Sequence, residues 1–204
     1  MERKEHWEKM YSKKSPLQVS WYQAEPKISL QLIEAIGYRK DAAIIDVGGG
    51  ASVLVDRLLE HGYSNVSVLD LSGRALAHAK NRLGKKSAAV NWLESDATDF
   101  TPPGMYDIWH DRAVFHFLTD SGDREKYINT LTKSLRKGGH LIIATFATGG
   151  PTKCSGLDIV QYDADKIATE LGIAFALQSE LFEMHITPSG GEQKFEYFHF
   201  IKQQ

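Results

Sequence analysis

Two aspartates stand where a nucleoside-binding cleft would place acids. Asp46 lies near the end of the apolar run 42–47, and the three glycines 48–50 follow that run at once. Asp70 closes a second apolar run at 66–70. The spacing between the two acids is close to the roughly 20 residues that separate a glycine loop from an acid bonded to a ribose. This pattern predicts a cleft at the carboxyl ends of parallel strands, with Asp70 on the ribose of a bound nucleoside.

The glycine loop distinguishes between two kinds of ligand. Gly48 and Gly50 match the first two glycines of the dinucleotide fingerprint, but its third glycine position holds Val53. Asp46 would repel a phosphate and attract a cation. Gly49, with the glycine on each side of it, would let the ligand approach the backbone closely. S-adenosylmethionine carries an ammonium and a sulfonium and has no phosphate, so the sequence favours this methyl donor over a dinucleotide.

Five segments carry a resemblance to a known family, in the order in which the family has them. They are 45–50, 69–72, 94–97, 106–111 and 135–141. On these segments the chain resembles the class I S-adenosylmethionine-dependent methyltransferases, and the match extends from about Trp7 to the C-terminus. The resemblance implies a Rossmann-like fold, S-adenosylmethionine as the cofactor and S-adenosylhomocysteine as its product. Ser52 stands where the family's first loop usually has a glycine.

The resemblance also implies which residues surround the adenosine. In the family, the acid of the third segment accepts a hydrogen bond from the adenine amino group, and Asp96 holds that position here, with Asp99 as a nearby alternative. A carboxylate selects adenine because the exocyclic amine donates a hydrogen bond and a keto base does not. Leu71 and Ala97, which follow the two strand-end acids, are expected to line the same pocket.

The segment 109–117 is rich in groups that could act on a substrate. His110 and Asp111 end a predicted strand where the transferable methyl group is expected, so both are candidates for orienting substrate or cofactor in catalysis. An ion pair between Asp111 and Arg112, or a helix cap, is the structural alternative. His116 lies in an apolar stretch typical of a core histidine. The spacing of His110 and His116 does not suit one helix face, so no metal site is expected.

Aromatic residues are concentrated before the glycine loop. We expect residues 1–40 to form an aromatic lid and a helix, and residues 41–204 to form the cofactor-binding core. Core packing explains Trp7 and Tyr11. Trp21 is expected to face the cleft, where an aromatic ring beside a sulfonium gains about 0.5–2 kcal/mol.

Apolar runs alternate with helical patterns along the chain. The alternation predicts a single α/β domain over 1–204, a Rossmann-like, doubly wound, seven-stranded sheet that is mostly parallel, with a C-terminal hairpin supplying an antiparallel edge strand. The expected strands are 42–47, 66–70, 88–93, 105–110, 140–146, 180–187 and 194–201. The expected helices include 52–61, 122–136, 163–171 and one between Ser72 and Gly84.

The bulk composition limits the classes of partner. The chain has 204 residues, a formal net charge of −2 and no apolar run near the roughly 18 residues of a membrane span. This net charge lacks the excess of basic residues that is typical of proteins that bind nucleic acid. Cys154 is the single cysteine, which excludes an intrachain disulfide and favours a reducing compartment. We therefore expect a cytoplasmic protein, with an inert loop cysteine, that binds neither nucleic acid nor membrane.

The methyl acceptor is the least determined part of the function. Transfer from a sulfonium is an in-line displacement by a nitrogen, sulfur or oxygen nucleophile. A protein lysine is one candidate, because residues 21–22 and 111–113 are similar to segments of the lysine methyltransferases of elongation factor and citrate synthase. The alternatives are a small thiol, thiopurine or metalloid and, from a different class, a nucleotide-binding protein without methyl transfer.

Overall fold

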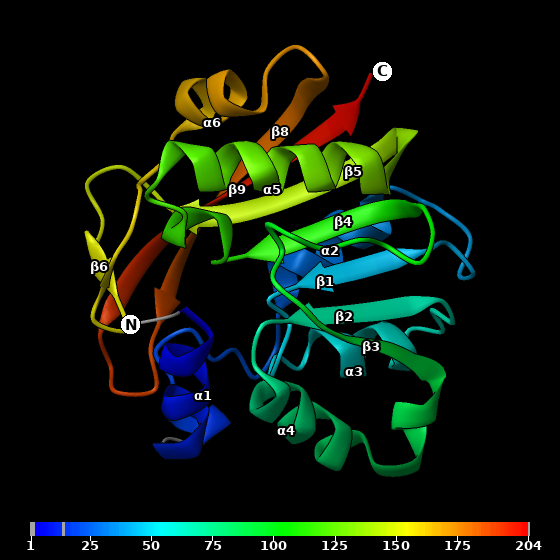
Figure 1. The fold of residues 1–204 in the computed structure, drawn as a ribbon, viewed down its shortest axis with the longest axis vertical. Helices are drawn as coiled ribbons and strands as arrows, with labels where there is room; N and C mark the ends of the chain where they lie inside the picture. Colours follow the sequence, from blue (N-terminus) through cyan, green and yellow to red (C-terminus); the bar gives the residue numbers. More distant parts are fainter. Residues whose placement is uncertain (1–2, 14, 204) are drawn as a thin grey trace.

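The chain folds around a mixed β-sheet (Figure 1). The computed structural model describes residues 3–13 and 15–203. The strands are β1 (Ile44–Val47), β2 (Val66–Asp70), β3 (Val90–Glu94), β4 (Tyr106–Arg112), β5 (Leu135–Phe146), β6 (Lys153–Cys154), β7 (Leu157–Asp158), β8 (Phe175–Ile186) and β9 (Glu192–Lys202). The main sheet has seven strands in the order β3-β2-β1-β4-β5-β9-β8, and β6 pairs only with β7. The predicted seven-stranded, mostly parallel α/β sheet is confirmed.

The centre of the sheet is parallel and covered on both faces. Strands β3, β2, β1, β4 and β5 pair in parallel, and every residue of β1 and β2 is buried. Burial on both faces explains why these strands are continuous apolar runs in the sequence. The strand order reverses between β1 and β4, with Asp46 opposite His110 and Val47 opposite Asp111. A reversal of this kind opens a crevice at the carboxyl ends of the strands.

The C-terminal hairpin differs from the predicted arrangement in one respect. β9 runs antiparallel to β5 and lies between β5 and β8, so β8 is the edge strand and runs parallel to β5. The predicted antiparallel strand of the C-terminal hairpin is confirmed as β9, and the turn at 187–191 places this strand inside the sheet rather than at its edge. Phe198 and Phe200 on β9 are fully buried, whereas Phe182 and Met184 on β8 are largely exposed.

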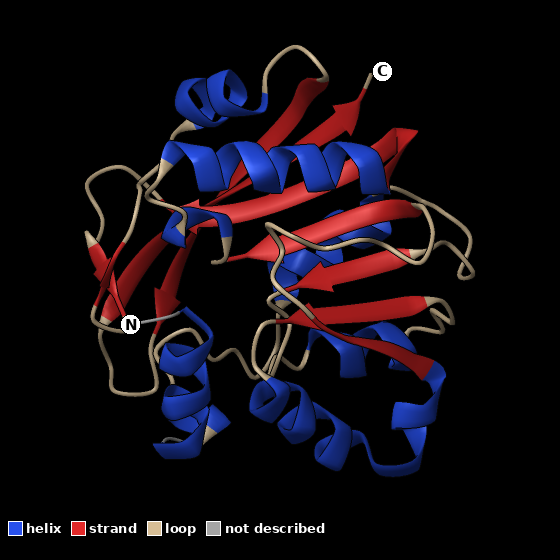
Figure 2. Cartoon of the chain, viewed as in Figure 1, coloured by secondary structure: helices blue, strands red, loops and turns tan. Residues whose placement is uncertain are grey.

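Helices cover both faces of the sheet (Figure 2). They are α1 (Arg3–Lys13), α2 (Lys27–Ala35), α3 (Leu54–Glu60), α4 (Gly73–Leu83), α5 (Ser121–Ser134) and α6 (Ala164–Leu171). Helices α2, α3 and α4 share one apolar cluster with the sheet, and α5 and α6 share the other. The Ser72 side chain accepts the Ala75 N–H at the start of α4, and Gly84 ends this helix, as the sequence predicts. Within the described residues, no helix is both long and apolar enough to cross a membrane.

Helix α1 lies beside α4 rather than in either helix layer (Figure 1). Lys4 pairs with Glu94 at the end of β3, with 2.6 Å between Nζ and Oε1. Glu8 pairs with Arg74 in the first turn of α4, with 2.9 Å between Oε2 and Nε. These contacts hold the N-terminal segment near the carboxyl ends of β2 and β3.

Candidate active site

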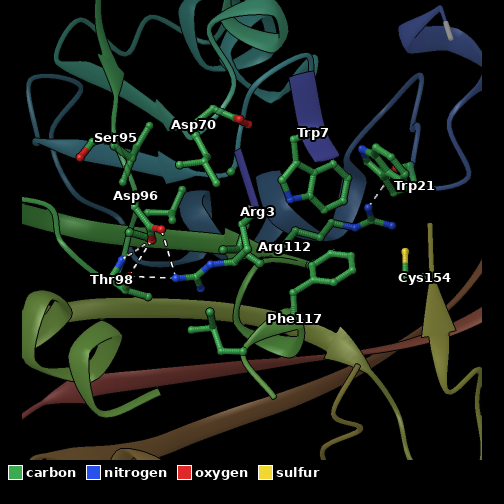
Figure 3. Close-up of a pocket in the computed structure, with 18 of the residues that line it drawn as sticks. Arg3, Trp7, Trp21, Asp70, Ser95, Asp96, Thr98, Arg112, Phe117 and Cys154 are labelled. Carbon is green, nitrogen blue, oxygen red and sulfur yellow. Dashed lines mark hydrogen bonds and ion pairs between the residues drawn. The ribbon is translucent and has the colours of Figure 1, made fainter. Parts of the chain in front are cut away.

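Two adjoining clefts open at the carboxyl ends of β1, β2 and β4. The first extends from Asp96 and Thr98 at one end to Trp21 and Cys154 at the other, with side chains of α1 on one side (Figure 3). The second is lined by the glycine loop and by residues of α2 and of the segment before it. Trp21 and Gly48 line both clefts, so the two share a wall.

The glycine loop lies directly against its neighbours. Gly48 has a φ of +68°, a conformation that favours glycine, and a Cβ at this position would overlap the side chain of Val114. A Cβ on Gly50 would overlap the carboxylate of Asp70. The loop therefore brings backbone, rather than side chains, to the edge of both clefts.

Asp46 and His110 are bonded to each other beneath this loop. The distance from His110 Nδ1 to Asp46 Oδ1 is 2.7 Å, and His110 Nε2 lies 2.9 Å from Ser29 Oγ on α2. Both residues are only 2% exposed. Asp46 Oδ2 is buried, has no partner among the described residues, and lies so close to Gly49 that a Cβ there would overlap it. Both side chains line the second cleft and not the first.

Asp70 is the acid that faces the first cleft. It ends β2, and its Oδ1 accepts the Ser72 N–H at 2.8 Å. Burial raises the pKa of the Asp70 carboxyl to about 7, and the negative charges of Asp46 and Glu8 act in the same direction. A carboxylate at this position can accept hydrogen bonds from paired hydroxyl groups, which suits a ribose.

Asp96 lies at one end of the first cleft (Figure 3), which Leu71 and Ala97 also line. Asp96 Oδ1 accepts hydrogen bonds from the N–H of Thr98, at 2.9 Å, and from its hydroxyl, at 2.8 Å. Asp96 Oδ2 pairs with Arg3 Nη2 of α1 at 3.2 Å. The alternative acid, Asp99, lines neither cleft. Sequence reasoning missed Arg3, because no motif marks it.

Aromatic residues from separate segments enclose the middle of the first cleft. Trp7 of α1 meets Trp21 and Phe117 edge to face, with ring centroids 5.7 Å and 5.1 Å apart. Trp21 lines the cleft, as the sequence leads us to expect. The interpretation of Trp7 and Tyr11 as core residues only is wrong, because both also line the first cleft.

Asp111 lies inside the fold rather than in a cleft. It is fully buried, and its oxygens accept hydrogen bonds from the Tyr127 hydroxyl and from the N–H groups of Val114 and Phe115. Burial raises the pKa of its carboxyl to about 6. Because the side chain lines neither cleft, the expected contact of Asp111 with a substrate does not fit this geometry. Its position instead fits the capping alternative, and it fixes the loop after β4.

Arg112 is the cleft residue that the sequence did not assign. An ion pair with Asp111 does not form, because successive side chains on a strand point to opposite faces of a sheet. The Arg112 guanidinium instead donates to the Tyr197 hydroxyl at 2.8 Å and to the Trp21 carbonyl at 3.0 Å, and it lies 3.4 Å from Glu183 Oε2. Arg112 lines both clefts.

The remaining candidate side chains are uncharged at neutral pH. Cys154 faces the first cleft, and burial raises the pKa of its thiol above the usual value. His116 is fully buried, and burial together with the charge of Arg112 lowers its pKa to about 3. Among residues 3–13 and 15–203, no group of three or more His, Cys, Asp or Glu side chains is placed to hold a metal ion.

Comparison with known proteins gives related sequences over about half of the chain. Residues 45–141 match a family described as "Methyltransferase domain". The chain is 25% identical over 104 residues to nodulation protein S of Rhizobium tropici, covering 51% of this chain and 43% of that protein. It is 27% identical over 125 residues to EEF1A lysine methyltransferase 2 of Danio rerio, covering 57% of this chain and 53% of that protein. The chain thus spans about half the length of these curated relatives.

The fold is shared over nearly the whole chain. The structure of the N-methyltransferase NodS from Bradyrhizobium japonicum WM9, solved with S-adenosyl-L-homocysteine, matches with a TM-score of 0.75 and 17% sequence identity. The match covers 98% of this chain and 98% of that chain. The chain thus resembles a methyltransferase domain in sequence over residues 45–141 and shares the fold of solved methyltransferases.

Proposed function

We propose that this chain binds S-adenosylmethionine across the two clefts and transfers its methyl group to an acceptor bound at the Cys154 end of the first cleft. The observation that carries the proposal is the buried carboxylate of Asp70, which faces the first cleft beside a glycine loop without room for side chains. When bound, the cofactor supplies an electrophilic methyl group on a sulfonium.

The described residues suit each part of this cofactor. Asp70 accepts hydrogen bonds from the ribose, and Leu71 and Ala97 enclose the adenine, with Asp96 on its amino group. The backbone of 48–50 lies along the chain that joins sulfur to the amino-acid group. Asp46 contributes negative charge beneath this loop and is held in place by His110, which is itself bonded to Ser29. We infer that His110 positions Asp46 and does not exchange protons with the acceptor, because both of its nitrogens are bonded.

In this proposal, alignment and exclusion of water supply most of the catalysis. Trp7, Trp21 and Phe117 line the first cleft and would exclude water from around a sulfonium bound beside them. Holding a nucleophile in line with the methyl group can contribute about 7–11 kcal/mol. The aromatic faces also suit a sulfonium, which favours the charged cofactor over the uncharged product.

The acceptor end of the first cleft favours an apolar small molecule. Among the described residues that line this cleft, the carboxylates of Asp70 and Asp96 lie toward the adenosine end, and Arg112 is the charged group toward the other end. The Cys154 thiol is held protonated by its raised pKa and is a poor base. We therefore infer an acceptor that reacts without a protein base, such as a thiolate or a neutral nitrogen on an apolar body.

A protein lysine is the second candidate, and the comparison with EEF1A lysine methyltransferase 2 favours it. A lysine with an ordinary pKa near 10.4 must lose its proton before attack. The positive charge of Arg112 would help to remove that proton by disfavouring an ammonium nearby. The lysine would have to reach the methyl group past the aromatic side chains of α1.

Calorimetry with defined ligands tests cofactor binding. We expect the purified protein to bind S-adenosylhomocysteine at micromolar concentration and not to bind NAD. Binding of NAD without S-adenosylhomocysteine would contradict the proposal.

Labelling identifies the acceptor class. A cell lysate incubated with the protein and tritiated S-adenosylmethionine, then separated into protein and small-molecule fractions, should carry enzyme-dependent label in the small molecules. The matched reaction contains the Asp70→Asn variant. Label confined to the protein fraction would favour the lysine candidate instead.

A further inference from the structure

The two edges of the main sheet differ in how they are protected. At one edge, β3 has 5 residues and ends in Glu94, which pairs with Lys4 of α1. At the other edge, β8 has 12 residues and, within the described part of the chain, pairs only with β9. An edge strand presents unpaired N–H and C=O groups, and proteins shorten, charge, bend or cover such edges to prevent further pairing. β8 is therefore the edge at which another strand could be added.

Only the first half of β8 carries this kind of protection. Its register with β9 shifts between Leu177 and Ser179, as in a β-bulge, and the residues 178–180 are polar and exposed. Bulges and charged side chains both oppose pairing between sheet edges. From residue 181 to residue 186 the register with β9 is regular. The one carboxylate of this stretch, Glu183, is bonded to Tyr197 and Gln23 of its own chain.

The second half of β8 presents a row of apolar side chains. Phe182, Met184 and Ile186 are 56%, 55% and 56% exposed. They alternate along the strand, so all three lie on one face of the sheet. Three large apolar side chains in a row beside an unpaired strand edge indicate an interaction surface rather than scattered exposure.

We propose that β8 pairs antiparallel with β8 of a second copy of this chain, about a two-fold axis at Met184. In this register, Met184 lies opposite Met184 of the second copy, and Phe182 lies opposite Ile186 of the second copy. The seven-stranded sheet then continues from one copy into the other. A two-fold interface requires a patch that is complementary to itself, and this row meets that requirement. The proposal goes beyond the proposed function and does not depend on any ligand.

The sequence of β8 selects this register over its neighbours. An axis at Glu183 would place two carboxylates opposite each other, and like charges in that position are destabilising. An axis at Phe182 would place Met184 opposite Glu180. An axis at His185 would pair two histidines and leave Phe182 opposite a proline, which has no N–H to donate. About Met184, each of the three apolar side chains meets an apolar side chain and no two carboxylates meet.

The surroundings of the row resemble the border of an interface. Glu192 and Lys194 of β9 are exposed beside it, opposite Ile186 and Met184. The Lys194 ammonium lies over the ring of Phe182, with 5.0 Å between Nζ and the ring centroid. An apolar centre with a polar rim is the usual composition of a protein interface. Pairing would bury the two apolar rows together and would satisfy the free backbone groups of both edges.

Charge exchange at the axis tests both the pairing and its register. Met184→Lys would place two ammonium groups opposite each other and should weaken self-association by at least about 100-fold, since like charges across an interface strongly disfavour binding. Met184→Glu should weaken self-association to a similar degree. An equimolar mixture of the two variants should associate again, because opposite charges then meet at the axis. Analytical ultracentrifugation over a dilution series measures all four samples.

A second apolar position supplies the matched control. Ile173 is 92% exposed and lies outside β8, so Ile173→Lys should leave self-association unchanged. Met184→Cys gives an independent measurement, because directly opposed strand residues lie within reach of a disulfide. Under mild oxidation Met184→Cys should form a covalent dimer and Ile173→Cys should not, since the chain's own Cys154 is buried.

Three outcomes would overturn the proposal. The first is an unmodified chain that stays monomeric at every concentration, which would leave this edge to an extended segment of another protein. The second is self-association that neither Met184→Lys nor Met184→Glu weakens, which would place the interface elsewhere. The third is a mixture of these two variants that stays monomeric, which would exclude an axis at Met184. Met184 is exposed and lines neither cleft, so unchanged circular dichroism would show that both variants remain folded.

Discussion

The two ends of the first cleft are built from different kinds of sequence. The proposed adenosine end is formed by Asp70, Leu71, Asp96 and Ala97, which lie at the ends of β2 and β3 or within a few residues after them. The acceptor end brings together α1, the loop after β4 and Cys154 of the β6–β7 hairpin. The proposed cofactor contacts are thus encoded locally at strand ends, whereas the proposed acceptor space depends on how distant segments pack. A sequence can keep the first and change the second, which fits relatives with different acceptors.

The largest expected effect concerns the glycine loop between the two clefts. Gly48→Ala should weaken S-adenosylhomocysteine binding by more than about 100-fold, because overpacking against Val114 and strain at a positive φ each cost about 1–3 kcal/mol. Isothermal titration measures this affinity. Gly62→Ala is the matched control, since Gly62 also has a positive φ of +85° but its added methyl group would meet no neighbouring atom within 4 Å. Equal losses in both variants would contradict a special role for the loop.

The next effect tests whether Asp111 takes part in catalysis or stabilises the folded structure. Asp111→Ala should lower the free energy of unfolding by about 2–4 kcal/mol, because it leaves the Tyr127 O–H and two backbone N–H groups as buried donors without an acceptor. Urea unfolding measures this change. Asp158→Ala, at an exposed acid paired with Lys153, should change stability by less than about 0.5 kcal/mol. A normally stable Asp111→Ala protein without turnover would restore the catalytic assignment.

Asp70 should show opposite effects on binding and on folding. Asp70→Asn should weaken S-adenosylhomocysteine binding about tenfold, the effect of one hydrogen bond to a charged group. Because the pKa of Asp70 is raised to about 7, the affinity of the unmodified chain should fall as the pH drops below 7, and the variant should lack this dependence. Titrations at pH 6 and pH 8 measure both. The same pH slope in both proteins would remove Asp70 from the ribose site.

The stability of the ligand-free protein should change with pH in the opposite direction from its affinity for the cofactor. The folded pKa of Asp70 lies above its usual value of 3.8, so the folded state holds this proton more tightly than the unfolded state between those two pKa values. The contribution of Asp70 to stability should therefore fall as the pH rises from about 4 to about 7. Asp70→Asn should lose that slope and unfold at a higher urea concentration than the unmodified chain at pH 8. A lower midpoint for the variant at pH 8 would contradict the buried-charge explanation.

The smallest expected effect lies in the middle of the cleft. Trp7→Leu should weaken S-adenosylmethionine binding by about 2- to 30-fold, corresponding to a cation–π contribution of 0.5–2 kcal/mol. S-adenosylhomocysteine has no sulfonium and should lose less affinity than S-adenosylmethionine. Trp92→Leu is the control, because Trp92 lines neither cleft. If Trp7→Leu lost the same affinity for both ligands, Trp7 would contribute to binding by packing and not by a cation–π interaction.

The sequence predicts those features that depend on neighbouring residues. The strand-end acids, the glycine loop and the cap at Ser72 each depend on a short segment, and the sheet follows from the alternation of strands and helices. The interior position of Asp111 was also within reach, because Asp111 and Arg112 are adjacent on a strand and must face opposite sides. Strand periodicity, rather than a motif, carried that signal.

The rest depends on tertiary contacts that no local pattern records. Arg112 meets Glu183 and Tyr197 only because β8 and β9 return beside β5 and bring those side chains over the end of β4. Arg3 reaches Asp96 only because α1 docks beside α4. The acceptor end was consequently the part of the site that sequence reasoning described least.

The ion pair between Arg3 and Asp96 has a consequence for how fast ligands exchange. An adenine amino group and the Arg3 guanidinium would approach the same carboxylate, so the first residue of α1 would compete with the nucleobase for Asp96. The pair is partly exposed, with side chains 37% and 30% accessible, and dissolved salt screens such pairs. Higher ionic strength should therefore accelerate cofactor entry, and Arg3→Gln should make the entry rate insensitive to salt in stopped-flow measurements.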